Sequence, residues 1–147
     1  MKGLSFTADG GFFAVDVTLV QKVARNLELT PVPAAPNAVI GIANMKGRVI
    51  TVLSLSALLG QTREKYTEKI CAVIFKSDDG EQMGLLIDKP GSLIDIDEDK
   101  IITPALLPGT EEEKFCVSGA IEAGAENKTR LYRIIDIDLI INKFKYA

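Results

Sequence analysis

Isoleucine and valine constrain the fold of this chain more than any other feature. They account for 26 of its 147 residues, and their branched side chains favour strands over helices. Most of them stand in short runs that glycine, proline, aspartate and asparagine interrupt, which is typical of strands joined by turns. With 47% hydrophobic residues, a chain of this length can bury a core without a metal or a disulfide. The sequence therefore predicts a mostly β protein.

Paired apolar runs with turn residues between them predict β-hairpins. Asp9-Gly10 supplies the positive φ angles that a tight turn needs. A second turn is predicted at Asn44-Met45-Lys46-Gly47, where Gly47 suits a position with a left-handed backbone. The run that follows Gly47 is apolar on both faces, Val49 included, so we expect it to be buried on both sides. The predicted strand pairs are 2–7 with 12–16, 39–44 with 48–54, 70–76 with 82–88, and 115–122 with 129–135, and a further strand is predicted at 92–96.

Three segments have the apolar spacing of short helices, and each follows a residue that can cap a helix N-terminus. Gly60 is suited to end the second of them. The third places lysines in its last turn, where they favour the helix dipole, and its apolar face should pack on the rest of the protein. The predicted helices are 17–24 after Asp16, 55–59 after Ser54 or Ser56, and 137–144 after Asp136.

The residue types exclude much catalytic and metal chemistry. Histidine is absent, which removes Ser-His-Asp and Cys-His catalysis and the commonest metal ligand. Cys71 and Cys116 stand in apolar runs, which favours buried thiols over a reactive pair. The acidic run 95–99 opens like a calcium loop, but Lys100 and Leu106 occupy positions where such a loop needs Gly and Glu. We therefore predict no catalytic residue, no metal site and no cofactor, and we do not expect an enzyme.

Charge and hydropathy limit the partners. The formal net charge of −3 argues against nucleic-acid binding, which needs a basic footprint. The longest charge-free stretches are 29–45, which three prolines interrupt, and 49–62, which is too short to span a bilayer. We expect no direct membrane insertion and a cytoplasmic location. Loops on a rigid scaffold often carry recognition, so the charges that flank Gly47 are either solvated turn residues or partner contacts, and the residues alone leave both readings open.

Four stretches in this order resemble the CheW family, the adaptor proteins of bacterial chemotaxis. Residues 39–50 (VIGIANMKGRVI) carry the most specific likeness, to the family pattern I-x-G-I-x-N-L-R-G-x-V-I. Residues 13–23 (FAVDVTLVQKV) resemble F-x-I-D-I-x-x-V-x-E-I, and residues 84–90 (GLLIDKP) resemble G-x-x-V-D-x-V. The ending at 135–140 (IDIDLI) is similar to L-D-I-x-x-L. The likeness extends over nearly the whole chain.

The resemblance implies a fold of two intertwined, SH3-like, five-stranded β-barrels with short helices and a C-terminal helix. It implies one domain over residues 1–147, with lobes of roughly 15–65 and 66–135 on which the N-terminal hairpin and the C-terminal helix pack. Its implied function is that of a non-enzymatic adaptor coupling the cytoplasmic tips of methyl-accepting chemoreceptors to the regulatory domain of a CheA-type histidine kinase. The alternative is a small-molecule-binding or regulatory β-barrel outside chemotaxis.

The resemblance also indicates which residues would bind partners. Lys46 stands where the family usually has Arg, and Lys22 stands where it usually has Glu. In the family this acid and this Arg lie close together, so the two lysines here would repel each other if they are adjacent, and a partner with a complementary acid is expected. The candidate partner-binding residues are Val20, Lys22, Gly41, Asn44, Lys46, Gly47 and Arg48.

Overall fold

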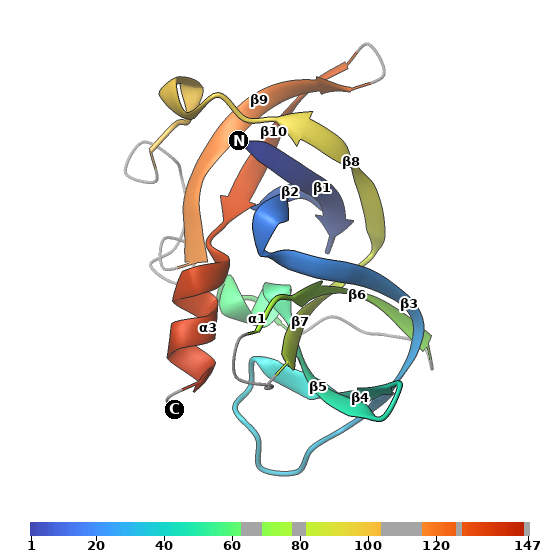
Figure 1. The fold of residues 1–147 in the computed structure, drawn as a ribbon. Coiled ribbons are helices and arrows are strands. Elements are labelled where there is room, and N and C mark those ends of the chain that lie inside the picture. Colours follow the sequence, from blue (N-terminus) through green and yellow to red (C-terminus); the bar gives the residue numbers. More distant parts are fainter. Residues whose placement is uncertain (63–68, 78–81, 104–115, 126–127, 146–147) are drawn as a thin grey trace.

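The computed structural model describes residues 1–62, 69–77, 82–103, 116–125 and 128–145. In Figure 1 two β units lie one above the other, and the helices α1 and α3 lie on one side of them. The strands are β1 (Lys2–Ala8), β2 (Gly11–Asp16), β3 (Val20–Thr30), β4 (Val39–Met45), β5 (Arg48–Leu53), β6 (Lys69–Phe75), β7 (Gln82–Ile87), β8 (Lys89–Asp95), β9 (Val117–Ala125) and β10 (Lys128–Ile135). The helical segments are η1 (Val17–Leu19), α1 (Leu55–Leu58), η2 (Glu98–Lys100) and α3 (Ile137–Lys145).

Each unit has five strands, and the chain passes from one unit to the other and back. A closed barrel has the order β3-β4-β5-β7-β6, and a second sheet has the order β8-β1-β2-β10-β9. Parallel pairs join β2 to β10 and β5 to β7, and the remaining pairs are antiparallel. This arrangement confirms the predicted mostly β fold with two five-stranded units, of which one is a closed barrel and the other a sheet.

The strands are not divided between the units at the lobe boundaries expected from the sequence. The strands β3 to β7 all belong to the barrel, so β6 and β7 share a unit with β3 rather than with β9 and β10. The N-terminal hairpin is part of the second sheet instead of packing on a lobe from outside. The physical reason is pairing: β1 satisfies its backbone groups against β2 on one side and β8 on the other.

The helix predicted at 17–24 is wrong. Asp16 does cap, because its Oδ1 accepts a hydrogen bond from the Thr18 amide at 3.0 Å, but it caps only the single turn of η1. Val20 then begins β3, and Ala24 lies opposite Ala72 of β6. The apolar spacing fitted a helix, but pairing with β6 outweighs that local pattern, as tertiary context commonly does.

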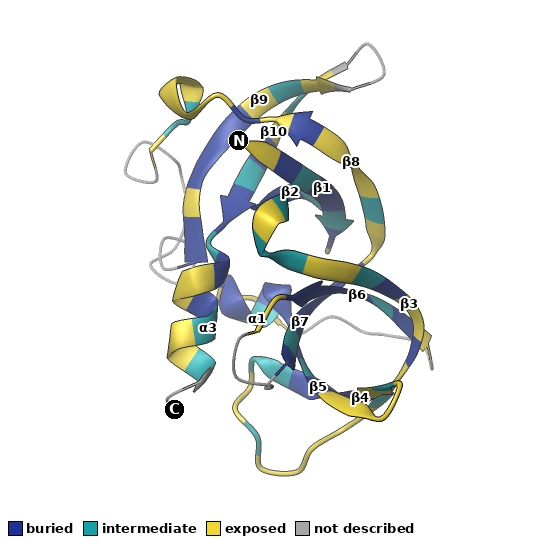
Figure 2. Cartoon of the chain, in the orientation of Figure 1, coloured by how far each residue is buried: buried dark blue, intermediate teal, exposed yellow. Residues whose placement is uncertain are grey.

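The prediction that β5 is buried on both faces is also wrong near the turn. Ile50, Val52 and Leu53 are fully buried, whereas Val49 is 58% exposed. Leu53 lies at the end of the strand that packs with α1 and α3 in the central cluster, while Val49 lies at the end next to the turn. Figure 2 shows the same change along the β4–β5 hairpin, whose tip is exposed.

Three hydrophobic clusters form the core. The central cluster joins the two units, since it contains Phe6 and Phe13 of the sheet, Val73 and Leu85 of the barrel, and residues of both helices. A second cluster fills the barrel, and a third lies in the sheet. The central cluster therefore couples the folding of one unit to that of the other.

The two remaining helix predictions are confirmed. Ser54 caps α1 by accepting a hydrogen bond from the Ala57 amide at 3.1 Å, and Gly60 follows with a positive φ of 80°. Asp136 caps α3 through the Leu139 amide at 3.1 Å. The apolar face of α3 packs into the central cluster. None of the helices in the described ranges has the length and apolar character to cross a membrane.

Several predicted features lie outside the described residues. They are the turn between the predicted strands 70–76 and 82–88, the first residue of the predicted strand 115–122, and Leu106 of the run compared with a calcium loop.

Candidate partner-binding site

The β4–β5 turn is the most closely defined part of the candidate site. Met45 pairs with Arg48, so Lys46 and Gly47 alone make the turn. Their φ angles are 52° and 83°, which is the left-handed pair that a type I′ hairpin needs. The Asn44 Oδ1 accepts a hydrogen bond from the Gly47 amide at 3.0 Å. Asn44 and Gly47 thus fix the turn, and the turn presents Lys46.

Gly41 has a packing role inside the same hairpin. It is buried, and a Cβ at this position would lie 2.7 Å from the Thr30 carbonyl oxygen and 2.9 Å from Leu29 Cγ. The end of β3 can therefore approach β4 closely only because residue 41 lacks a side chain.

Positive charge collects at the exposed end of the hairpin. Lys46 and Arg48 are exposed, and within the described part of the chain no carboxylate forms an ion pair with either of them. Val49, the next residue along β5, adds exposed apolar surface. A pair of cations beside an apolar side chain suits an acidic, amphipathic partner.

Val20 and Lys22 occupy a different neighbourhood. Val20 is half-buried against the central cluster and lies opposite Phe75. Lys22 is exposed and lies opposite Ile74 of β6. Both stand at the start of β3, whereas β3 pairs with β4 only at its end, through Leu29 and Thr30.

The candidate residues thus fall into two groups. The first, which we call the hairpin group, contains Gly41, Asn44, Lys46, Gly47 and Arg48. The second, the β3 pair, contains Val20 and Lys22. The strand register brings the hairpin group together but does not pair the β3 pair with it.

A groove beside the hairpin group was missed by the sequence analysis. It has a volume of about 380 Å³, and its apolar lining includes Val49 of β5, Met83 of β7 and Phe144 of α3. Thr51 and Met83 lie opposite each other in the parallel β5–β7 pair, which brings two distant segments into one surface. The signal in the sequence was misread, because Val49 was assigned to the core.

The described residues offer little for chemistry. Among them, no group of three His, Cys, Asp or Glu side chains could hold a metal ion. Cys71 and Cys116 do not form a disulfide. Burial raises the pKa of the Cys71 thiol, and the nearby Arg25 only partly offsets this, so the reactive thiolate is disfavoured at neutral pH.

Comparison with known proteins assigns the chain to a family. The family model for the CheW-like domain matches residues 2–145. A chemotaxis protein CheW from Thermotoga maritima is 30% identical over 98 residues, which are 67% of this chain and 64% of that protein, slightly less than two thirds of its length. A chemotaxis protein CheW from Bacillus subtilis is 26% identical over 142 residues, which are 97% of this chain and 87% of that protein.

A solved structure has a similar fold. The scaffolding protein TtCheW from Thermoanaerobacter tengcongensis superimposes with a TM-score of 0.72 at 25% identity, covering 92% of this chain and 88% of that one. Together the matches support a chemotaxis adaptor or scaffold role and do not favour the alternative of a small-molecule module outside chemotaxis. The match over residues 2–145, the two-unit β fold and the named relatives show that this chain belongs to the CheW-like domain family.

Proposed function

We propose that this adaptor couples the cytoplasmic tip of a methyl-accepting chemoreceptor to the regulatory domain of a CheA-type histidine kinase. The observation that carries the proposal is the family match over residues 2–145. In this proposal the chain is a single, cytoplasmic, non-enzymatic domain that uses no cofactor. It acts by holding two proteins together, so it can change kinase activity only by binding one state of the assembly better than another.

The receptor face would include the hairpin group and the adjoining groove. Apolar side chains of a receptor helix would enter the groove beside Val49, while acidic side chains would meet Lys46 and Arg48 at the rim. Interfaces of this kind combine an apolar centre with a polar edge. The rigid turn supports this role, because a side chain held in one position loses less entropy when it binds.

The β3 pair would form a second part of the receptor face. The exposed ammonium of Lys22 would favour an acidic partner there, where the family usually has an acid of its own. A receptor for this adaptor should therefore carry more acidic residues at its tip than a receptor for an adaptor with Glu at this position. The kinase domain would pack against another edge or end of the two β units.

Two substitutions on the hairpin test the receptor face. Lys46→Glu should weaken binding of a receptor-tip fragment about 3- to 10-fold at low salt, and less at high salt, because exposed ion pairs are weak and screened. Val49→Asp should weaken binding by about 10-fold or more, because it places a charge in the apolar groove. Both residues are exposed, so the melting temperature should change little.

Isothermal titration calorimetry would measure these affinities, with circular dichroism melts for stability. Lys100→Glu is the matched control, since it reverses an exposed lysine in η2, outside the barrel. The same receptor affinity for wild type, Lys46→Glu and Val49→Asp would remove the hairpin group from the receptor face.

A further inference from the structure

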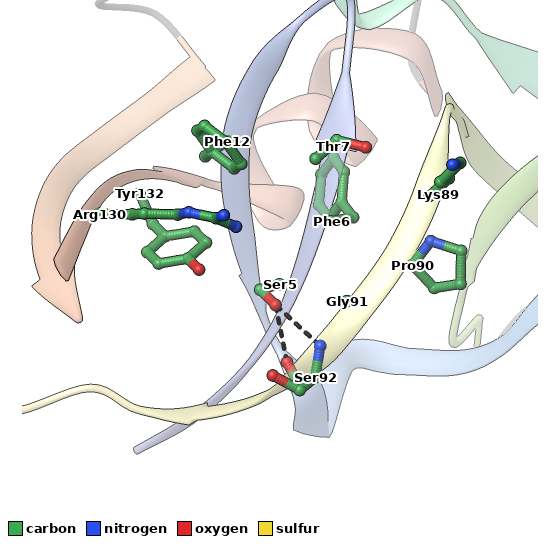
Figure 3. Close-up of a pocket in the computed structure, with 10 residues that line it drawn as sticks. All are labelled: Ser5, Phe6, Thr7, Phe12, Lys89, Pro90, Gly91, Ser92, Arg130 and Tyr132. Atoms are coloured by element: carbon green, nitrogen blue, oxygen red, sulfur yellow. Dashed lines mark hydrogen bonds between the residues drawn. The ribbon is translucent and has the colours of Figure 1, made fainter. Parts of the chain in front are cut away.

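A cavity with a volume of about 400 Å³ opens in the second sheet, the unit that does not contain the hairpin group. Its walls come from β1, β2, β8 and β10, as Figure 3 shows. Pockets that bind small molecules commonly have this size, with apolar walls and a few polar groups that converge.

A β-bulge forms the floor of this cavity. In the β1–β8 pair, Leu4 lies opposite Leu93 and Phe6 lies opposite Pro90, so Ser5 faces both Gly91 and Ser92. The buried Ser5 Oγ donates to the Ser92 carbonyl at 2.9 Å and accepts from the Ser92 amide at 2.9 Å. A Cβ at residue 91 would collide with Ser5 Oγ. The floor is therefore held by its own hydrogen bonds and depends on glycine.

An aromatic wall presents an unused hydroxyl to the cavity. Phe12 and Tyr132 pack edge to face, with ring centroids 6.0 Å apart. Tyr132 is only 3% exposed, and its hydroxyl points into the cavity (Figure 3). In the portion of the chain that the structure describes, no group hydrogen-bonds this hydroxyl. The ring of Tyr132 is buried, but its hydroxyl oxygen is not among the enclosed polar atoms, so it can hydrogen-bond a ligand that enters the cavity.

Two cations flank the same space from opposite sides. Arg130 of β10 places its guanidinium 4.7 Å from the centroid of the Phe12 ring, and Lys89 of β8 stands across the cavity (Figure 3). Neither forms an ion pair with another described residue, and none of the lining residues is acidic. A concave site with one sign of charge concentrates ligands of the opposite sign.

We propose that this cavity binds a small organic anion with one ring. Its carboxylate or phosphate would lie between Arg130 and Lys89 and accept a hydrogen bond from the Tyr132 hydroxyl. Its ring would pack against Phe12 and Pro90. The site is separate from the hairpin group, so the inference does not depend on the receptor face proposed above.

The test is a titration of ¹⁵N-labelled protein followed by NMR, with phenyl phosphate and benzoate as charged probes and benzyl alcohol as the neutral probe. A saturable shift of the Gly91 and Ser92 amides is expected with at least one charged probe, and the comparison of the two shows whether phosphate or carboxylate is preferred. Benzyl alcohol should bind at least about 10-fold more weakly, because a charge-assisted hydrogen bond is lost.

Two variants locate the anion. Arg130→Gln should weaken binding of the charged probe about 10-fold, and Tyr132→Phe should weaken it by a few-fold while leaving the ring packing intact. Arg25→Gln, which removes an exposed cation from β3 of the barrel, is the matched control and should bind as wild type does. The proposal fails if the shifts do not saturate, if benzyl alcohol binds equally well, or if Arg130→Gln binds the charged probe as wild type does. It also fails if Arg130→Gln loses affinity only for the kinase domain or the receptor tip, since the cavity would then be a protein-docking site.

Discussion

The barrel and the second sheet have the same number of strands, but only the barrel returns to its first strand. In the sheet, β8 and β9 remain at the two ends of the strand order. The barrel interior is filled by aliphatic side chains, among them Ile50, Val52 and Ile74. The sheet interior is also largely aliphatic, with Ile94, Ile121 and Ile134 among its buried residues, but it includes Tyr132, with Phe12 packed against it. One unit is thus closed around an aliphatic core, and the other is open and adds an aromatic pair to its core.

This difference separates two kinds of surface. Closure leaves the barrel without a free strand edge, and a closed unit can hold a short turn such as Lys46-Gly47 in one position. Both units contain bulges, and the cavity of the open sheet lies above the bulge at Ser5. Only the exposed Lys2–Asp95 ion pair is shown to link side chains across the β1–β8 edge, and the hydrogen bond from Lys2 lowers the pKa of Asp95. Such a pair adds little stability.

The largest expected effect comes from a substitution in the central cluster, because the two units share this core and both should unfold. Leu53→Asp should abolish cooperative folding, with a loss of more than about 4 kcal/mol, since an unpaired charge would enter the central cluster. Chemical denaturation followed by circular dichroism would measure the loss. Val49→Asp on the same strand is the control and should unfold near the wild-type midpoint. A cooperative transition of Leu53→Asp close to that of the wild type would show that the two units do not share this core.

A pair of glycine substitutions compares the rigidity of the two units. Gly41→Ala in the barrel should cost about 1–3 kcal/mol, because the new Cβ meets backbone atoms of Thr30 that cannot move alone. Gly3→Ala in the sheet should cost less, about 1 kcal/mol or below, because the atom it meets is the terminal methyl of Ile96, which can rotate away. Denaturant midpoints of the two variants give the ranking. A larger loss for Gly3→Ala would mean that the sheet, and not the barrel, is the more rigid unit.

The smallest expected effect is a change in stability on substitution in the two hairpin turns. Asp9-Gly10 in the sheet and Lys46-Gly47 in the barrel both have positive φ angles. Lys46→Gly should raise stability by about 0.5 kcal/mol, because lysine is strained in the left-handed region and the flexibility of glycine offsets part of the relief. Asp9→Gly should change it by roughly zero, because aspartate tolerates that region better. High-precision thermal melts of both variants are the measurement, and equal gains would show that strain at Lys46 is not specific to that residue.

Local signals were sufficient for much of the fold. Asp9-Gly10 predicted the first turn, and Gly47 predicted a left-handed position in the second, which is shorter than the expected 44–47. The caps at Ser54 and Asp136 predicted α1 and α3. These features depend on residues within four positions of one another, so a sequence carries them directly. The family motifs then supplied the candidate site residues, five of which lie together on one hairpin.

Long-range packing explains what local signals could not predict. The parallel pairing of β5 with β7 depends on residues 32 positions apart, such as Ile50 and Gln82, and it forms the groove beside Val49. The segment after Asp16 has helical spacing, yet most of it forms β3, which pairs with β6. The cavity at Tyr132 needs β1, β2, β8 and β10 together, and no motif in the sequence indicates it.

The central claim is that this chain holds a receptor tip and a kinase regulatory domain at the same time. Analytical ultracentrifugation of the adaptor with each fragment separately, and then with both, tests it most directly. The account predicts a saturable complex with each fragment and a heavier complex containing all three proteins. Failure to bind either fragment, or displacement of one fragment by the other, would contradict it.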